Sequence, residues 1–249
     1  MIANTIDEVI EQLEYIIQDS IVEESTLGYF AALYQKVTIT VKNKLGTNYF
    51  DDDIRMEKLD VIFANRYLTA YANYKEGKPI SKSWLSAFTT ATQWRPIVLQ
   101  HLLLGMNAHI NLDLGIAAAE ITNPNTISDL QADFNKINTI LSALVTEVLD
   151  DLSQIWPTLI KILKFTNKVD DFLINFSMTV ARDGAWTFAN ALVNQPNVFS
   201  KDQAILQRDL DITEFSKTIT NHKFTVKMIL LAARIGERGN VSDKIKTLL

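Results

Sequence analysis

The sequence predicts an all-α protein, and three observations support that prediction. Only eight glycines and five prolines occur in 249 residues, which fits long helices better than a turn-rich β fold. Apolar residues recur at helical spacing along most of the chain. One segment, residues 96–121, is apolar on almost every side, as a buried helix is. We therefore expect a single all-α domain over residues 1–249, with about eight helices around a buried central helix at 96–121.

Composition narrows the classes of function. The formal net charge is −5 and no long basic run occurs, so nucleic acid is not an expected partner. The absence of cysteine excludes disulfides, thiolate nucleophiles and cysteine-ligated zinc. The N-terminal residues are acidic where a signal peptide would be basic. We expect a cytoplasmic protein without a transmembrane segment.

The first two helices are expected at residues 4–19 and from Ser25 to Gly46. Asn4 or Thr5 is the candidate N-cap of the first helix, because its side-chain oxygen could accept a free backbone N–H. The second helix ends in VTITV, which is β-branched and alternating, so a short strand is the competing interpretation.

A third helix is expected to begin at the acidic run 51–53, where negative charge complements the helix dipole, and to stop near Gly77. Ser81 or Ser83 would cap a short fourth helix around Trp84. We expect Trp84 to serve only for packing.

The central helix is expected to begin at Pro96, which suits a first turn, and to end at Asn123-Pro124. Polar residues interrupt its apolar run, so we interpret it as buried in protein rather than membrane-spanning. Gly105 and Gly115 weaken a helix, and close approach of neighbouring helices would compensate for that cost.

The sequence after residue 124 predicts four further helices. Thr126 or Ser128 would cap a helix reaching Leu152, and the next helix covers 169–193. Residues 200–249 predict two more helices, with a frayed polar terminus.

The polar residues of the central helix are the candidates for chemistry: His101, Asn107, His109, Asn111 and Asp113. At about 100° per residue, His109 and Asp113 lie about 40° apart around the axis, one turn apart. Asn107 and Asn111 form a second ridge. Burying such groups unpaired costs several kcal/mol, so other helices must supply partners.

Several phrases together resemble a known family. They are LGYFAALYQKVT at 27–38, RMEKLDVIFANRYLTAY at 55–71, the tryptophan Trp84 after Pro79, HLLLGMNAHINLDLGIAA at 101–118 and ARDGAW at 181–186. They resemble the DUF5995 family of uncharacterised, mainly bacterial proteins. The resemblance implies shared polar positions, which correspond here to Arg66, His101, Asn107, His109, Asp113 and Arg182. It implies no catalytic assignment.

One hypothesis is a divalent metal site. His109 and Asp113, four residues apart on a helix, are a possible ligand pair for zinc, iron or manganese, and such a metal would activate water. Further ligands would come from His101, Glu57, Asp60, Glu120 or Asp183. Neither an HExxH motif nor paired Glu-x-x-His motifs are present.

A second hypothesis is a metal-free site for a small anionic molecule. Arg66 and Arg182 stand in otherwise apolar helices, and a guanidinium fork matches a carboxylate or phosphate. His101 or His109 would be the acid or base beside Asp113. Asn107 and Asn111 would complete the ligand-binding set.

A third hypothesis is a structural or interaction protein. In it, Asp113 orients His109, and Arg66 and Arg182 pair with Asp60 or Asp183. Six aromatic residues could line an apolar ligand pocket or a dimer face: Tyr29, Phe30, Tyr34, Tyr67, Tyr71 and Tyr74. The sequence thus favours a helical protein whose buried His/Asp/Asn/Arg cluster binds a small anionic or apolar ligand. A metal-dependent hydrolase or oxidoreductase and a non-catalytic protein are the alternatives.

Overall fold

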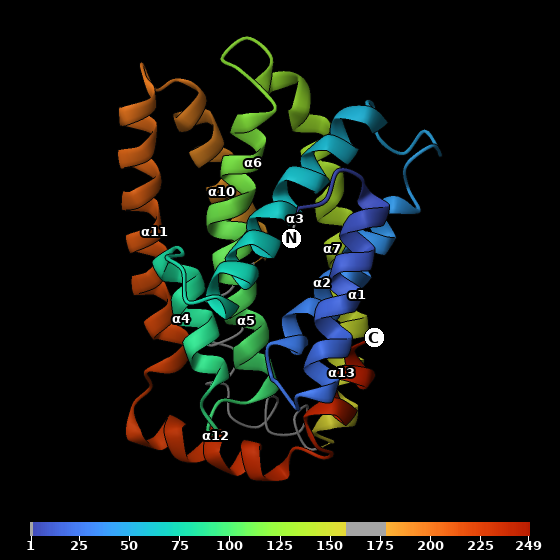
Figure 1. The fold of residues 1–249 in the computed structure, drawn as a ribbon, viewed down its shortest axis with the longest axis vertical. Helices are drawn as coiled ribbons and strands as arrows, with labels where there is room; N and C mark the ends of the chain where they lie inside the picture. The colour runs from blue at the N-terminus through green and yellow to red at the C-terminus, as the bar shows by residue number, and fades with distance from the viewer. Residues whose placement is uncertain (1, 158–177) are drawn as a thin grey trace.

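The computed structural model describes residues 2–157 and 178–249, and every regular element in these ranges is helical (Figure 1). The all-α class is therefore confirmed. The elements are α1 (Ile6–Val22), α2 (Gly28–Lys42), α3 (Asp53–Lys75), α4 (Lys82–Ala91), α5 (Val98–Ala108), η1 (His109–Asp113), α6 (Leu114–Glu120), α7 (Ile127–Ile155), α10 (Met178–Val193), α11 (Val198–Thr220), α12 (Phe224–Gly236) and α13 (Val241–Leu248). The described ranges thus contain eleven α-helices, against the expected eight or so.

Most helices begin where the sequence predicts. Thr5, Asp52 and Ser81 are the N-caps of α1, α3 and α4, and each side chain accepts a backbone N–H of the first turn. The VTITV segment is helical. Its threonine hydroxyls, of Thr38 and Thr40, donate to backbone carbonyls four residues earlier, which satisfies them inside the helix.

The central helix is one continuous helix made of α5, η1 and α6. Figure 1 shows it upright in the middle of the molecule, with α11 alongside and α3 crossing it. Helices α2, α4 and α11 pack on α5, and helices α3 and α10 pack on α6. The stretch Val98–Glu120 has the length and composition of a membrane span, and 89% of its apolar window is buried inside this structure.

Two glycines of the central helix let neighbours approach closely, as expected. A Cβ at Gly105 would overlap the ring of Phe30 on α2. A Cβ at Gly115 would lie 2.8 Å from the backbone carbonyl oxygen of Ala185 on α10. The helix therefore has no room for larger side chains where α2 and α10 cross it.

The C-terminal region differs from the prediction. It forms three helices rather than two, and the expected fraying of the terminus is wrong. The N–H groups of Val241 and Ser242 donate to the Glu24 carboxylate, and Ile245 and Leu248 are buried. These contacts hold α13 against the N-terminal helices. Of the helix expected at 169–193, Met178–Val193 is present as α10, and 169–177 lie outside the described residues.

Candidate functional site

The middle of the central helix is a π-helical turn. The N–H of Leu114 donates to the carbonyl of His109, five residues back, instead of four. Single π-helical turns are uncommon and often occur at functional sites. Within this turn the side chains of His109 and Asp113 are in contact, with His109 Nδ1 3.2 Å from Asp113 Oδ2.

Asp113 is a buried carboxylate, 1% exposed, that accepts from three side chains. Arg66 Nε donates to Oδ1 at 2.8 Å, and Trp84 Nε1 donates to Oδ2 at 2.8 Å, beside His109 Nδ1. Burial alone would raise the pKa of Asp113, but Arg66 and the two ring N–H donors hold it below its usual value. Asp113 is therefore an anion that fixes His109.

His109 is neutral and held among aromatic rings. Its imidazole stacks on the Phe63 ring at 3.6 Å between centroids, and the Tyr34 ring meets it edge-on at 4.5 Å. Burial lowers the pKa of His109 in spite of Asp113. Because Asp113 accepts the proton on Nδ1, Nε2 is the free acceptor. Nε2 is buried and has no hydrogen-bond partner among the described residues.

His109 lines a cavity of about 420 Å³, called here the inner pocket. Side chains of α2, α3, α5 and α7 form most of its wall, and nearly all of them are hydrocarbon or aromatic. They include Phe30, Leu33, Leu59, Leu103, Met106 and Leu152. The polar side chains in the wall are Tyr34, Asp60, His109 and Arg182.

Asp60 and Arg182 are buried in this wall without a charged partner among the described residues. Asp60 Oδ2 has no hydrogen-bond partner, and burial together with Glu57 raises the pKa of Asp60 to about 7. Arg182 donates once, from Nη2 to the Phe134 carbonyl, while its Nε and Nη1 have no partner. The expected pairing of Arg182 with Asp60 or Asp183 is therefore absent. The expected pairing of Arg66 with either is also wrong, since Arg66 binds Asp113.

Asp113 lines a second cavity of about 450 Å³, called here the outer pocket, which is more open and more polar. Arg66, Trp84 and Glu120 also line it, and Arg66 Nη1 lies 3.7 Å from Glu120 Oε1. The His109–Asp113 pair therefore stands between two cavities. The imidazole borders the apolar one and the carboxylate borders the polar one.

A family model described as "Family of unknown function (DUF5995)" matches residues 6–222. The chain belongs to the DUF5995 family. The matched range runs from α1 through α11, so both pockets of this DUF5995 protein lie within it. No curated protein and no solved structure matches the chain.

In this DUF5995 protein, His101 is not part of the His109–Asp113 cluster. It is buried on α5 beside the Tyr29 ring, at 5.6 Å between centroids, and it lines neither pocket. Burial, followed by the charge of Arg234, lowers the pKa of His101 to about 3. His101 is therefore a neutral core residue.

The two asparagines tie the central helix to α11. Asn107 Nδ2 donates to the Ile212 carbonyl and to Ser216 Oγ, both at 3.0 Å. Asn111 Nδ2 donates to Asn107 Oδ1 at 2.9 Å, and the Asn111 carbonyl accepts from Arg208. Neither asparagine lines a pocket, so the structure does not place them with Arg66 or Arg182.

The expected metal ligands do not converge. The described residues contain no group of three or more His, Cys, Asp or Glu side chains placed to hold a metal ion. Both oxygens of Asp113 are engaged by N–H donors, and Glu120 lies beside Arg66. The metal role of His109 and Asp113 stays a prediction.

Sequence reasoning missed the role of Trp84, which it treated as packing. A buried indole N–H usually finds an acceptor, and this general rule was the available signal. Of the six aromatic residues considered for a pocket, Phe30 and Tyr34 line the inner pocket. Tyr29, Tyr67 and Tyr71 pack in the core around it.

Proposed function

We propose that this DUF5995 protein binds a small, mainly apolar molecule in the inner pocket. A volume of about 420 Å³ is typical of ligand sites, which span roughly 300–1,000 Å³ and combine apolar walls with few polar groups. The observation that carries the proposal is the set of buried polar atoms without partners in this wall, on Tyr34, Asp60, His109 and Arg182.

These atoms favour a binding site over a packing defect. Buried polar groups in folded proteins are nearly always hydrogen-bonded, because an unmet group costs about 1–3 kcal/mol. Cavities that stay empty are lined by apolar groups, whereas polar groups in a cavity wall are satisfied by water or a ligand. A bound molecule, or water that occupies the pocket until the molecule binds, would satisfy the unpartnered atoms of these four side chains.

The test is binding of N-phenylnaphthylamine, a neutral apolar dye that fluoresces in apolar surroundings. We expect saturable binding to one site. Met106→Trp, which fills the inner pocket, should weaken binding at least about tenfold, the effect of about 1.4 kcal/mol. Met228→Trp, at an exposed position of α12, is the matched control and should leave binding unchanged. Equal binding by both variants would contradict the proposal.

A second candidate function uses His109 as a general base on the molecule in the inner pocket. It is supported by Asp113, which holds the Nδ1 proton and leaves the Nε2 lone pair free at the pocket wall. Imidazole NMR tests the tautomer. We expect the Nδ1–H form in the wild type, and loss of that form in Asp113→Asn would support the arrangement. An Nε2–H form in the wild type would exclude this role.

The metal alternative has its own measurement. Elemental mass spectrometry of protein prepared without chelator would reveal zinc, iron or manganese in stoichiometric amount. Loss of that metal in Asp113→Ala would support a metal-dependent enzyme and contradict the metal-free reading of His109.

We also propose that the protein acts in solution in the cytoplasm, with Val98–Glu120 as a core helix. The burial of most of that stretch among other helices supports this. Cell fractionation should recover the protein in the soluble fraction. Recovery in salt-washed membranes would contradict it.

A further inference from the structure

Arg182 is a buried cation, and two of its nitrogens have no hydrogen-bond partner among the described residues. It is 1% exposed, on α10, and its guanidinium lies over the Phe134 ring at 4.7 Å from the centroid. The Phe134 carbonyl takes one N–H group. Nε and Nη1 have no partner, and no carboxylate of the described residues forms an ion pair with Arg182.

A buried cation in this position needs an anionic partner. Burial lowers the pKa of Arg182 to about 10, so the guanidinium stays protonated at neutral pH. A buried charge is costly unless it is paired, which is why arginine is rarely buried alone. Because Arg182 lines the inner pocket, a bound anion is the partner that its two free N–H groups can reach.

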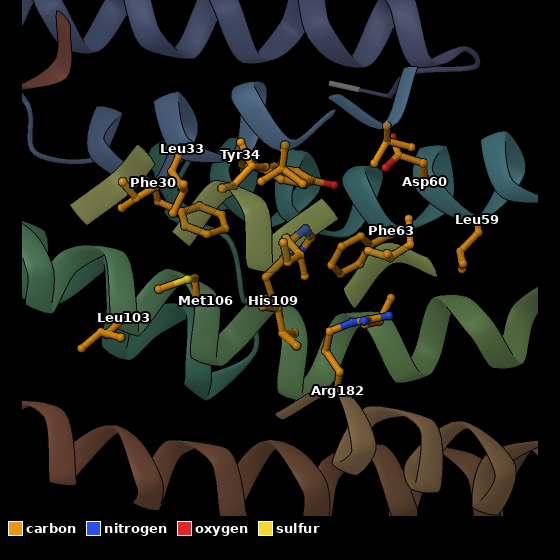
Figure 2. Close-up of a pocket in the computed structure, with 18 of the residues that line it drawn as sticks. Phe30, Leu33, Tyr34, Leu59, Asp60, Phe63, Leu103, Met106, His109 and Arg182 are labelled. Atoms are coloured by element: carbon orange, nitrogen blue, oxygen red, sulfur yellow. The ribbon is translucent and has the colours of Figure 1, made fainter. Parts of the chain in front are cut away.

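The charged side chains of the inner pocket lie toward one side of it. Figure 2 shows Phe30, Leu33, Leu103 and Met106 on one side of His109. Asp60 and Arg182 lie on the other side, together with the apolar side chains of Leu59 and Phe63. A molecule with an apolar body and one charged end fits this arrangement.

Volume limits the size of that molecule. At about 420 Å³, the inner pocket lies toward the lower end of the roughly 300–1,000 Å³ that ligand sites span, so it suits a single-chain molecule better than a two-chain phospholipid. A medium-chain acid such as dodecanoate is of this size class. An unpartnered N–H group of Arg182 can donate to a carboxylate oxygen in a charge-assisted hydrogen bond.

We propose that the molecule held in the inner pocket is a medium-chain carboxylic acid whose carboxylate binds Arg182. This inference rests on the proposed function and adds the chemical class to it. The hydrocarbon chain extends past His109 toward Phe30 and Met106.

The experiment compares dodecanoic acid with dodecanol by titration calorimetry on the full chain. Dodecanoate should bind the wild type about tenfold to a hundredfold tighter than dodecanol, because a charge-assisted bond is lost in the alcohol. Arg182→Met should remove that preference and keep the binding of dodecanol. Arg208→Met is the matched control, since Arg208 also lies over an aromatic ring, that of Phe188, and lines neither pocket.

A thermal melt separates ligand binding from a structural role. If Arg182 serves binding, Arg182→Met should melt higher than the wild type without dodecanoate, because it removes a buried unpaired charge. If Arg182→Met does not fold, Arg182→Lys takes its place. It keeps the charge but lacks the guanidinium N–H donors, so it should bind dodecanoate more weakly than the wild type.

Three outcomes overturn the proposal, and they can be told apart. Equal affinity of the wild type for dodecanoate and dodecanol would reject the carboxylate while leaving an apolar site. A preference that survives Arg182→Met would reject Arg182 as the partner. Binding of neither dodecanoate nor dodecanol nor N-phenylnaphthylamine would reject the proposed function itself.

Discussion

Asp60 is the side chain that couples the inner pocket to pH. Burial and Glu57 raise the pKa of Asp60 to about 7 in the folded protein, whereas an unfolded chain releases this proton near pH 4. The folded state therefore binds the proton more tightly than the unfolded state does. Between about pH 4 and pH 7 this difference costs stability as the pH rises, and the cost is complete above pH 7.

Asp60→Asn should remove the loss of stability that deprotonation of Asp60 causes. We expect a melting temperature several degrees above the wild type at about pH 8, and little difference at about pH 4, where Asp60 is protonated in both states. Scanning fluorimetry across this range measures it. Asp202→Asn, at an exposed position of α11, is the control and should show no pH-dependent gain. A lower melting temperature for Asp60→Asn at pH 8 would mean that the carboxylate is ionised and compensated.

His109 should matter more to the fold than His222. His109→Ala removes the stack on Phe63 and one donor to Asp113, so we expect a loss of about 2–4 kcal/mol of unfolding free energy. His222→Ala, at the end of α11, should cost less than about 1 kcal/mol. Urea unfolding compares the two. Equal, negligible losses would show that the central helix carries no special interaction at His109.

Part of this cluster could be predicted from the sequence and part could not. The spacing of His109 and Asp113 was enough to predict that one orients the other. The Arg66–Asp113 pair and the Trp84 donor join residues 47 and 29 positions apart, so only the packing of α3 and α4 decides them. The absence of an ion pair at Arg182 among the described residues depends in the same way on how the helices pack.

At the scale of helices, carboxylates of one helix or loop cap the start of another. Asp209 on α11 accepts the N–H groups of Lys82 and Ser83, at 2.7 and 2.9 Å. The same contact recurs between Asp133 and residues 51–52, between Glu237 and Val98, and between Glu24 and residues 241–242. Each satisfies N–H groups that a helix start leaves free, and each fixes two distant segments together.

Asp209→Ala tests this capping. Two N–H groups, of which that of Ser83 is buried, lose their acceptor, so we expect a loss of about 1–3 kcal/mol of unfolding free energy. Asp202→Ala, on the exposed side of the same helix, should change stability by less than about 0.5 kcal/mol. Chemical denaturation provides both values. A loss as small as that of the control would mean that water replaces the carboxylate.

Helix boundaries could be predicted from the sequence where the residues that set them lie within the same turn. Thr5, Asp52 and Ser81 cap the helices expected of them because a cap needs only its own first turn. The break between α12 and α13 was missed, although Gly239 has φ of +78° and Asn240 caps α13. The π-helical turn has no such local signal. The free energy that it costs is offset by hydrogen bonds to Asp113 from Arg66 on α3 and Trp84 on α4.

At the scale of the whole molecule, the two ends of the chain are packed together. Helix α13 lies against α1, α2 and α7, and Figure 1 shows the red C-terminal helix beside the blue N-terminal ones. A Cβ at Gly28 would lie 2.6 Å from Ile245, so the contact is close. The last helix is therefore part of the core.

Ile245→Ala should destabilise the protein by about 2–5 kcal/mol, because it opens a cavity beneath α13. Leu249→Ala, at an exposed position next to that helix, is the control and should cost less than about 1 kcal/mol. Urea unfolding measures both. Similar small losses would show that α13 contributes little to the core.

The helical class and the burial of the central helix followed from composition and apolar spacing, which act on every residue. The inner pocket could not be predicted in that way. A cavity is the space left after helices of fixed shape have packed, and Leu59 or Leu103 gives the same sequence signal whether it faces a neighbour or a void.

The π-helical turn also accommodates one extra residue within the central helix. A π turn is equivalent to one residue inserted into an α-helix. Deleting one residue between His109 and Asp113 would therefore restore regular winding and leave α6 close to its present orientation, with Gly115 still against α10. His109 and Asp113 would then be three residues apart instead of four, and the contact between the imidazole and the carboxylate would change. A single-codon deletion here would thus alter the pair that stands between the two pockets and keep the packing of α6.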